Sequence, residues 1–269
     1  MAKLKGLLNI TGKLEDLSMY KMHGVDEIVV RRKGGPTKKM IKNSDSCIRI
    51  RENNTEFSTC SAMGRVIRDN LQINTYSSDY SSSGKLNALM MQMLKKDEHH
   101  DRGVRGICLS QNREMLDGFD FGKNQSFNNV VKKLPEVVVD REHLTARIRI
   151  PETHGENHLY NFPGKSWMRY EIRFAIISDM QYNAEREKAM PVNELCHGIS
   201  AYYESEWIPA KGVIPGQEVV LSVAEQAGGK LSENDSLVVS VTLHYGDVGV
   251  DGKPHDAKYG AVTRIFAVK

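Results

Sequence analysis

Long apolar runs are missing from this 269-residue chain, because even residues 174–177 form a run of only four. A transmembrane helix needs roughly 18 or more apolar residues in succession, so the sequence predicts no membrane span. The first 14 residues carry lysines but no long apolar stretch, since Asn9, Thr11 and Gly12 interrupt it. No secretory signal is therefore expected. We predict a cytoplasmic protein that does not associate with membranes.

Cysteines are few, and their spacing is not that of a metal or redox site. The four are Cys47, Cys60, Cys108 and Cys196, and no two of them form a C-x-x-C pair. Such pairs mark zinc sites and thioredoxin-like redox motifs. Because no export signal is expected, we predict that the four cysteines are reduced and mostly buried.

Common catalytic and nucleotide-binding signatures are also absent: there is no G-x-S-x-G elbow, Walker A loop or G-x-G-x-x-G sequence. His154 and His158 have the spacing of metal ligands on a helix. Pro151, Gly155 and Pro163 surround them, however, so a polar loop between strands is favoured over a metal site. The sequence predicts a protein that is not an enzyme, with no catalytic residue, no metal and no cofactor.

Two other polar groups have a structural interpretation beside a catalytic one. Cys196 and His197 are neighbours, and on a strand they would point to opposite faces. A Cys/His pair formed in space remains an open alternative. Asp117 and Asp120 flank phenylalanines, and a turn with two aromatic anchors is favoured over an acid/base pair.

The composition is that of a folded protein, with 40% hydrophobic and 26% charged residues. The charge, however, is unevenly distributed. Residues 1–105 contain 19 basic and 12 acidic residues, a net of +7, whereas residues 106–269 contain 18 and 22, a net of −4, which together give +3. This imbalance favours a basic face with an anionic partner, either nucleic acid or the acidic part of another copy.

Short strands and then two helices are predicted in the first 105 residues. A hairpin is expected from residues 17–22 and 28–30, with a turn between them. A helix is expected to start at residues 53–55, and Ser83 is a plausible N-cap of a second helix. Apolar residues then recur at spacings of three and four, which predicts one buried face on each helix. These residues are Phe57, Cys60, Met63, Ile67 and Leu71, then Leu86, Leu89, Met90, Met93 and Leu94.

The remaining residues, 106–269, are rich in predicted strands. Residues 137–139 and 144–150 flank a turn, and in the second arm Ala146, Ile148 and Ile150 alternate with arginines as in a half-buried strand. Further strands are expected at 167–177, 199–208, 218–224, 237–245 and 261–268. No helical pattern separates them, which favours an antiparallel β-sandwich. We predict an α+β fold with a basic N-terminal module (1–105) and a β-rich domain (106–269).

The most distinctive feature is a basic segment without acidic residues. Its members are Arg31, Arg32, Lys33, Lys38, Lys39 and Lys42. Three interpretations remain open: a solvated loop, a contact with another copy, and a phosphate contact with nucleic acid. The segment lacks the aromatic residues on which single-stranded bases stack.

Four stretches form a recognisable pattern: LSMYK (17–21), VVRRKGGPTKKMIK (29–42), RIREN (49–53) followed by Glu56 and Phe57, and LDGFDF (116–121). The pattern resembles that of a family of uncharacterised Bacteroidota proteins, over about the first 120 residues. That family usually has Thr in place of Ile50 and Gly in place of Ser58. The resemblance implies a basic N-terminal module followed by a variable β-rich part. The resemblance implies no activity and identifies no catalytic residue.

These observations favour a non-enzymatic structural protein that self-assembles as the subunit of a tube, filament or shell. Head-to-tail contacts between a basic and an acidic region generate rings or open polymers. An N-terminal strand could also extend the sheet of a neighbour. The alternative is a nucleic-acid-binding protein of phage or mobile-element origin.

Overall fold

The computed structural model describes residues 2–4, 10–22, 24–32, 34–73, 82–122, 125–159 and 165–269. The chain is α+β, as expected, and divides into two compact units. We call residues 1–51 the N-terminal unit and residues 52–269 the body. The sequence pattern had placed this boundary at 105/106 instead.

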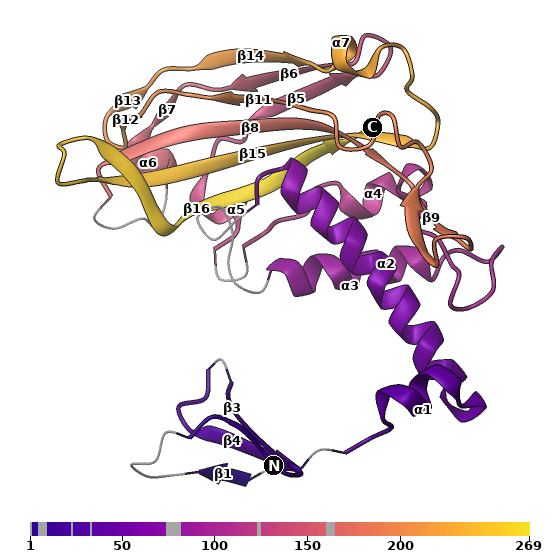
Figure 1. Cartoon of the computed structure of the whole chain (residues 1–269). Helices are drawn as coiled ribbons and strands as arrows, with labels where there is room; N and C mark the ends of the chain where they lie inside the picture. The colour runs from indigo at the N-terminus through magenta and orange to yellow at the C-terminus, as the bar shows by residue number, and fades with distance from the viewer. Residues whose placement is uncertain are drawn as a thin grey trace. The chain divides into compact units, whose positions relative to one another are not determined.

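The N-terminal unit contains a small antiparallel sheet (Figure 1). Its strands are β1 (Ala2–Leu4), β2 (Gly12–Leu14), β3 (Leu17–Lys21) and β4 (Ile28–Arg32), in the spatial order β1-β4-β3-β2. The predicted hairpin is present as β3 and β4, with Leu17 opposite Arg32 and Lys21 opposite Ile28. Two three-residue strands extend it on either side.

Helix α1 (Lys38–Asn43) follows the sheet, and the 3₁₀ turn η1 (Asp45–Cys47) leads into α2 (Ile48–Asn70). The hydroxyl of Thr37 caps α1 by accepting the Met40 N–H at 3.2 Å. The predicted helix start at residues 53–55 is therefore wrong. Arg51 donates to the carbonyls of Ile41 and Ser44, at 2.7 and 2.9 Å, and so fixes the corner between α1 and α2. Residues before 53 are thereby held in helix.

The body consists mainly of antiparallel strands, as predicted. They are β5 (Glu136–Asp140), β6 (Thr145–Ile150), β7 (Thr153–His154), β8 (Trp167–Ser178), β9 (Met180–Asn183), β10 (Lys188–Pro191), β11 (Ser200–Glu204), β12 (Ile208–Pro209), β13 (Val213–Ile214), β14 (Gln217–Ser222), β15 (Asp235–Val248) and β16 (Pro254–Val268). A three-stranded sheet, β14-β6-β5, packs on a five-stranded sheet, β11-β8-β15-β16, in which β12 also pairs with β8. Figure 1 shows the smaller sheet lying over the larger one.

The core between the two sheets follows from the period-two alternation of the strands. On β6, Ala146, Ile148 and Ile150 are buried, whereas Arg147 and Arg149 face solvent, as predicted. On β8, Phe174 and Ile176 point into the same core. The sheets are thus held together by apolar side chains from every second position.

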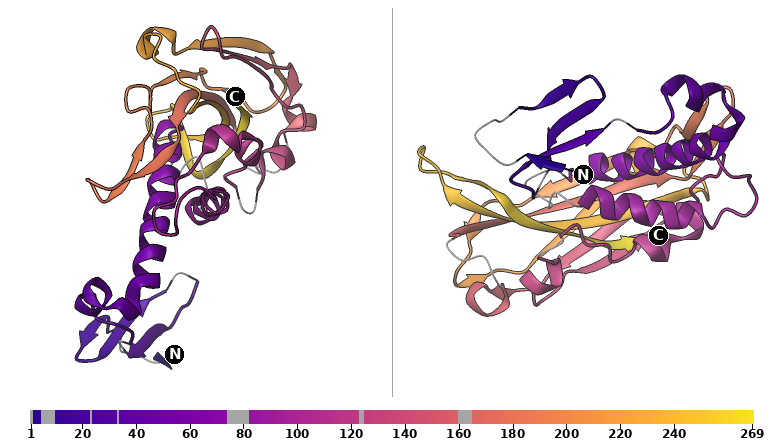
Figure 2. Two further views of the ribbon diagram at one scale, coloured as in Figure 1. Left: turned by 90° about the vertical axis from the view of Figure 1, so that its right-hand side faces the viewer. Right: turned by 90° about the horizontal axis from the view of Figure 1, so that it is seen from below.

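Helices cover the other face of the larger sheet (Figures 1 and 2). Besides α2, the body contains α3 (Ser82–Leu94), η2 (Leu109–Gln111), α4 (Arg113–Leu116), α5 (Phe127–Val130), α6 (Gly155–His158) and α7 (Ala224–Ala227). The predicted apolar faces of α2 and α3 pack with Ala175, Ile177 and Val238 of the sheet. Both helices therefore belong to the core of the body.

Two residues of these predicted faces behave differently. Leu89 is only partly buried, and Phe57 is 58% exposed, so its predicted burial is wrong. Glu56 takes the inward position beside Phe57, because its carboxylate accepts the N–H of Gly103 at 3.0 Å and lies 3.8 Å from the Arg105 guanidinium. The hydrogen-bonded carboxylate of Glu56 therefore lies inside, and the Phe57 ring lies outside.

The four cysteines are free thiols; Cys47, Cys60 and Cys196 are buried and Cys108 is partly buried, as expected. Burial raises the pKa of Cys60 to about 12, so this thiol is unreactive at neutral pH. None of the described helices is long and apolar enough to cross a membrane.

Candidate functional site

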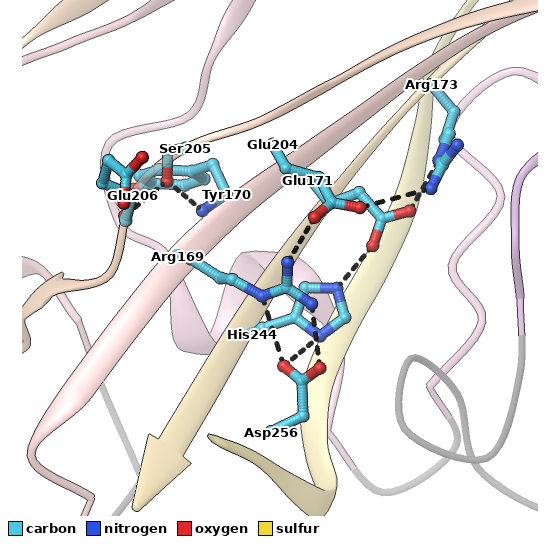
Figure 3. Close-up of polar contacts among 9 residues, drawn as sticks. All are labelled: Arg169, Tyr170, Glu171, Arg173, Glu204, Ser205, Glu206, His244 and Asp256. Carbon is cyan, nitrogen blue, oxygen red and sulfur yellow. Dashed lines mark hydrogen bonds and ion pairs between the residues drawn. The ribbon is translucent and has the colours of Figure 1, made fainter. Parts of the chain in front are cut away.

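Six charged side chains form a closed ring on the larger sheet (Figure 3). We call them the charge ring; they are Arg169, Glu171 and Arg173 of β8, Glu204 of β11, His244 of β15 and Asp256 of β16. The three β8 residues alternate along the strand and therefore share one face of the sheet. This is the face that carries Ala175 and Ile177 under the helices.

Each member of the ring contacts two partners of opposite sign. Glu171 lies 2.9 Å from His244 Nε2 and accepts from Arg173 Nε at 2.6 Å. Arg173 lies 3.5 Å from Glu204, which in turn accepts from Arg169 Nη1 at 2.6 Å.

Asp256 closes the ring. Its two oxygens accept from Arg169, from Nη2 at 2.8 Å and from Nε at 3.3 Å, which is a bidentate arrangement. His244 Nδ1 lies 3.3 Å from Asp256 Oδ1, a close ion-pair contact without the alignment of a hydrogen bond. Both ring nitrogens of His244 therefore face carboxylates.

Strand register explains why these residues meet. His244 lies opposite Arg169, and Glu204 lies opposite Glu171. The β15–β16 pairing is irregular, because Ala261 is opposite His244 whereas Asp256 is opposite Gly246. The extra residues of β16 at this irregularity bring Asp256 next to His244.

Electrostatics favour the protonated form of His244. Burial alone would lower the pKa of this histidine, which is 3% exposed, but Asp256 and Glu171 raise the pKa above its ordinary value. For Glu171, burial acts to raise the pKa, but His244 and Arg173 bring it below its usual value. The pKa of Asp256 falls to about 2, because its contacts with the cations His244 and Arg169 outweigh its burial. With His244 protonated, three cations balance three anions.

Aromatic rings flank the two arginines. The Arg169 guanidinium lies 5.3 Å from the Trp207 ring centre, and that of Arg173 lies 4.4 Å from Tyr202. Such cation–π contacts hold a guanidinium in place. The ring can thus bind a proton at His244 and cross-link four strands. Among the described residues, no group of histidine, cysteine and acidic side chains is arranged to hold a metal ion.

A second polar region lies at another edge of the body, where a cavity of about 380 Å³ is lined by Ser110, Gln111, Arg113, Arg141, Glu233 and Asn234. Both arginines donate to backbone carbonyls: Arg113 to Asp235 at 3.2 Å, and Arg141 to Ser232 at 2.8 Å. The Ser110 hydroxyl donates to Asp179 at 2.5 Å. These bonds fasten the segment around η2 to the end of the sheet.

The structure places the predicted basic segment on two elements of the N-terminal unit. Arg31 and Arg32 are exposed on β4 and, as strand neighbours, point to opposite faces. Lys38, Lys39 and Lys42 are exposed on α1, so this part of the basic segment is a helix and not a loop. Arg32 lies 3.8 Å from Asp16 in a surface ion pair. Lys33 lies outside the described residues.

The N-terminal unit also exposes many apolar side chains. Among its described residues, the buried hydrophobic ones are Ile28, Val29 and Cys47. Those with more than a third of their surface exposed are Ile10, Leu14, Leu17, Tyr20, Met22, Met40 and Ile48. Register places Leu14 opposite Leu17, on the same face of the sheet. No sequence pattern had separated these residues from ordinary core residues.

The other sequence candidates have local structural roles. His154 and His158 lie at β7 and α6, so the predicted loop is instead a short helix, and His158 Nδ1 accepts the His154 N–H at 2.9 Å. His197 Nδ1 accepts the backbone N–H of Ser178 at 3.1 Å. Asp120 accepts the N–H groups of Gly122 and Phe127, as expected of a turn residue.

The charge ring was missed from the sequence, although its strand was predicted. The alternation of Arg169, Glu171 and Arg173 within residues 167–177 is a signal, because charges on one face of an otherwise apolar strand need partners. The partners lie 31 to 87 residues away along the chain, from Arg173 with Glu204 to Arg169 with Asp256. Spacing could not identify them.

Comparison with known proteins found no matching family model, no matching curated protein and no matching solved structure. The resemblance to a Bacteroidota family therefore stays a prediction.

Proposed function

We propose that this protein is a non-enzymatic structural subunit that self-assembles into a homo-polymer such as a tube, filament or shell. In this proposal the N-terminal unit contacts another copy. The observation that carries the proposal is the exposure of apolar side chains across this unit.

A unit of about 50 residues is near the lower limit for a stable core, and few of the hydrophobic residues that the structure describes in it are buried. Leu14, Leu17 and Met40 are each more than a third exposed. Clustered exposed apolar residues commonly mark interaction sites. The short edge strands β1 and β2 also carry backbone groups on which a neighbouring strand can pair. A partner that covers these residues would stabilise the unit.

Charge supports a second copy as that partner. Residues 1–51 contain 12 basic and five acidic residues, a net of +7, whereas residues 52–269 contain 25 and 29, a net of −4. Opposite charges on two parts of one chain favour head-to-tail association and disfavour head-to-head association. Because such a contact joins two different surfaces, it generates rings or open polymers.

The test reverses charge in the N-terminal unit by replacing Arg31, Arg32, Lys38 and Lys39 with Glu. Assembly is measured by light scattering and negative-stain microscopy, and folding by the circular-dichroism melt. We expect a folded variant without assemblies, because like charges then meet across the contact.

The matched control makes the same change of eight charges on the body. It replaces Lys95, Lys188, Lys211 and Lys230, which are all exposed. This variant should assemble like the unaltered protein. Normal assembly of the N-terminal variant would refute the proposal. So would an unaltered protein that is monomeric at every concentration.

One observation favours nucleic-acid binding as the second candidate. Tyr20 is exposed, and register places it on the same sheet face as Arg31 and Lys13. An aromatic ring beside cations can stack on bases of a single strand. Nuclease treatment distinguishes the candidates: it would release the partner of a nucleic-acid-binding protein and leave a protein homo-polymer intact.

A further inference from the structure

Strands β15 and β16 pair in two separate blocks. The inner block ends at the pair His244–Ala261, and the outer block begins at the pair Gly246–Asp256. Residues 257–260 of β16 therefore lie between the blocks, opposite a single residue of β15. We call these four residues the bulge, and the chain from Gly246 to Asp256 the outer hairpin. Figures 1 and 2 show this end of the hairpin projecting from the sheet.

The bulge is a close fold of the backbone. A Cβ atom on Gly260 would lie 2.7 Å from the Ala257 Cβ and 2.9 Å from the Ala257 carbonyl oxygen, so a glycine is needed there. Because the regular pairing is interrupted at the bulge, a change of its backbone dihedral angles can move the outer hairpin and leave the inner block in place.

Two acidic side chains of the outer hairpin pair with residues outside it, among the residues that the structure describes. Asp247 pairs with Lys165, but half of the Asp247 side chain is exposed, so solvent screens this pair. Asp256 pairs with Arg169 at 2.8 Å and lies 3.3 Å from His244 Nδ1. These last two partners are far less exposed. The charge ring is therefore the main side-chain attachment of the outer hairpin to the sheet.

The contact between His244 and Asp256 depends on a proton. A neutral imidazole carries one N–H, and the Nε2 contact with Glu171, at 2.9 Å, has hydrogen-bond geometry, whereas the Nδ1 contact with Asp256 lacks the alignment of a hydrogen bond. We therefore expect neutral His244 to keep its proton on Nε2. The lone pair of Nδ1 would then face the Asp256 carboxylate, and attraction would become repulsion.

The charged groups around His244 sum to zero only while it is protonated. Loss of the proton leaves two cations and three anions in the charge ring, at a site where burial weakens screening by solvent. These groups come from every described strand packed around His244: Arg169, Glu171 and Arg173 from β8, Glu204 from β11 and Asp256 from β16 (Figure 3).

We propose that the charge ring is a pH switch, in which loss of the His244 proton releases Asp256 and the outer hairpin detaches from the sheet by a rotation at the bulge. The inference goes beyond the proposed self-assembly and does not depend on it. Because the pKa of His244 lies above 6.5, the outer hairpin is attached at pH 6 and below and detaches as the pH rises through the pKa of the folded state.

Trp207 is placed to report this change. A Cβ atom on Gly246 would lie 2.6 Å from Cζ3 of the Trp207 ring, so the indole packs directly on the backbone of the outer hairpin. Its ring centre also lies 5.3 Å from the Arg169 guanidinium. The sequence contains one other tryptophan, Trp167, and Trp167→Phe makes the fluorescence specific. Detachment exposes the indole to water and should shift its emission to longer wavelength.

The first test is a fluorescence titration of the full-length W167F protein between about pH 6 and pH 9. Amide hydrogen exchange, followed by mass spectrometry and corrected for the intrinsic effect of pH, measures the same change in the unaltered protein. We expect protection of the outer hairpin to fall about tenfold or more, since each unit of pKa difference between the two states corresponds to a factor of ten. Protection of residues 170–177 in β8 should stay the same.

Three variants identify the titrating group. His244→Gln removes it, so the emission and the protection should no longer depend on pH. Asp256→Asn removes the repelled charge, and its amide can donate to the neutral Nδ1, so the outer hairpin should stay attached at both pH values. His255→Gln is the matched control, because His255 pairs with Asp251 within the outer hairpin and is exposed. This variant should behave like the unaltered protein.

Circular-dichroism melts verify that each variant is folded, and the titration of the unaltered protein does not depend on any variant. A pH-independent outer hairpin in the unaltered protein would overturn the switch. So would a transition that persists in H244Q or disappears in H255Q. Equal loss of protection in β8 would overturn it too, because the change would then be unfolding of the whole body.

Discussion

At the scale of single residues, His244 is the most informative side chain of the molecule. It is buried between Glu171 and Asp256, and the two arginines of the charge ring neutralise the remaining negative charge. Removing one member of a buried ion network usually costs more than the network contributes as a whole. The ring therefore couples protonation of one histidine to the alignment of four strands.

His244 gives the stability of the body a defined pH dependence. Its pKa in the folded state is above the ordinary value of 6.5. Its stabilising contribution is then fully present below pH 6.5 and is lost as the pH rises through the folded pKa. We predict that His244→Gln lowers the free energy of unfolding by about 2 kcal/mol at pH 6 and flattens its decline toward alkaline pH. Urea unfolding at several pH values measures both effects.

His143→Gln is the control for this prediction. His143 also pairs with an aspartate, Asp140, but both side chains are exposed. Solvent screens such a pair, so the substitution should change stability little at any pH. A steep alkaline decline that persists in H244Q would show that another group titrates.

At acid pH the stability of the body depends on pH in the opposite direction, through Asp256. The pKa of Asp256 is about 2, below its ordinary value of 3.8. Its contribution is present above pH 3.8 and is lost as the pH falls toward 2. The ring should therefore be most stabilising between about pH 4 and 6.5.

At the scale of elements, the helices α2 and α3 are part of the core of the body. Met90 and Met93 of α3 are buried against the sheet, whereas Leu89 is partly buried. We predict that Met90→Ala lowers the free energy of unfolding by about 2–5 kcal/mol, the usual loss for a buried large side chain. Chemical denaturation measures this loss.

Substitutions at two other positions of α3 serve as comparisons for Met90→Ala. Leu89→Ala should cost less than Met90→Ala, because Leu89 is already partly in contact with solvent. Gln92→Ala, at an exposed position, should shift stability by within about 0.5 kcal/mol. Equal losses at Met90 and Gln92 would mean that α3 does not pack on the sheet.

At the scale of the whole molecule, the division at 51/52 separates a unit with little core from one with two apolar clusters. A chain that begins at Glu52 retains both clusters. We predict that it unfolds cooperatively with a melting temperature close to that of the full chain, and that it does not assemble. Calorimetry and light scattering measure these two properties. A broad, non-cooperative melt would show that the body needs residues 1–51 for its own stability.

Much of the architecture was predictable from local patterns. Alternation in residues 145–150 predicted which side chains of β6 are buried, and spacings of three and four predicted the inner faces of α2 and α3. Prediction failed where a polar interaction overrode the pattern. Phe57 continues the apolar stripe of α2, but the bond from Gly103 to Glu56 places a carboxylate inside instead.

The sequence by itself determined the α+β class, the antiparallel strands, the buried thiols and the basic character of residues 31–42, because each depends on composition or on short-range periodicity. Tertiary structure decided the rest. Arg169, Glu204, His244 and Asp256 meet only because strand register and the irregularity in β16 bring distant residues to one face. Tertiary structure also decided which apolar side chains are exposed. Val250, between β15 and β16, and Val241, in the core, are the same residue type, and only packing leaves Val250 exposed and Val241 buried.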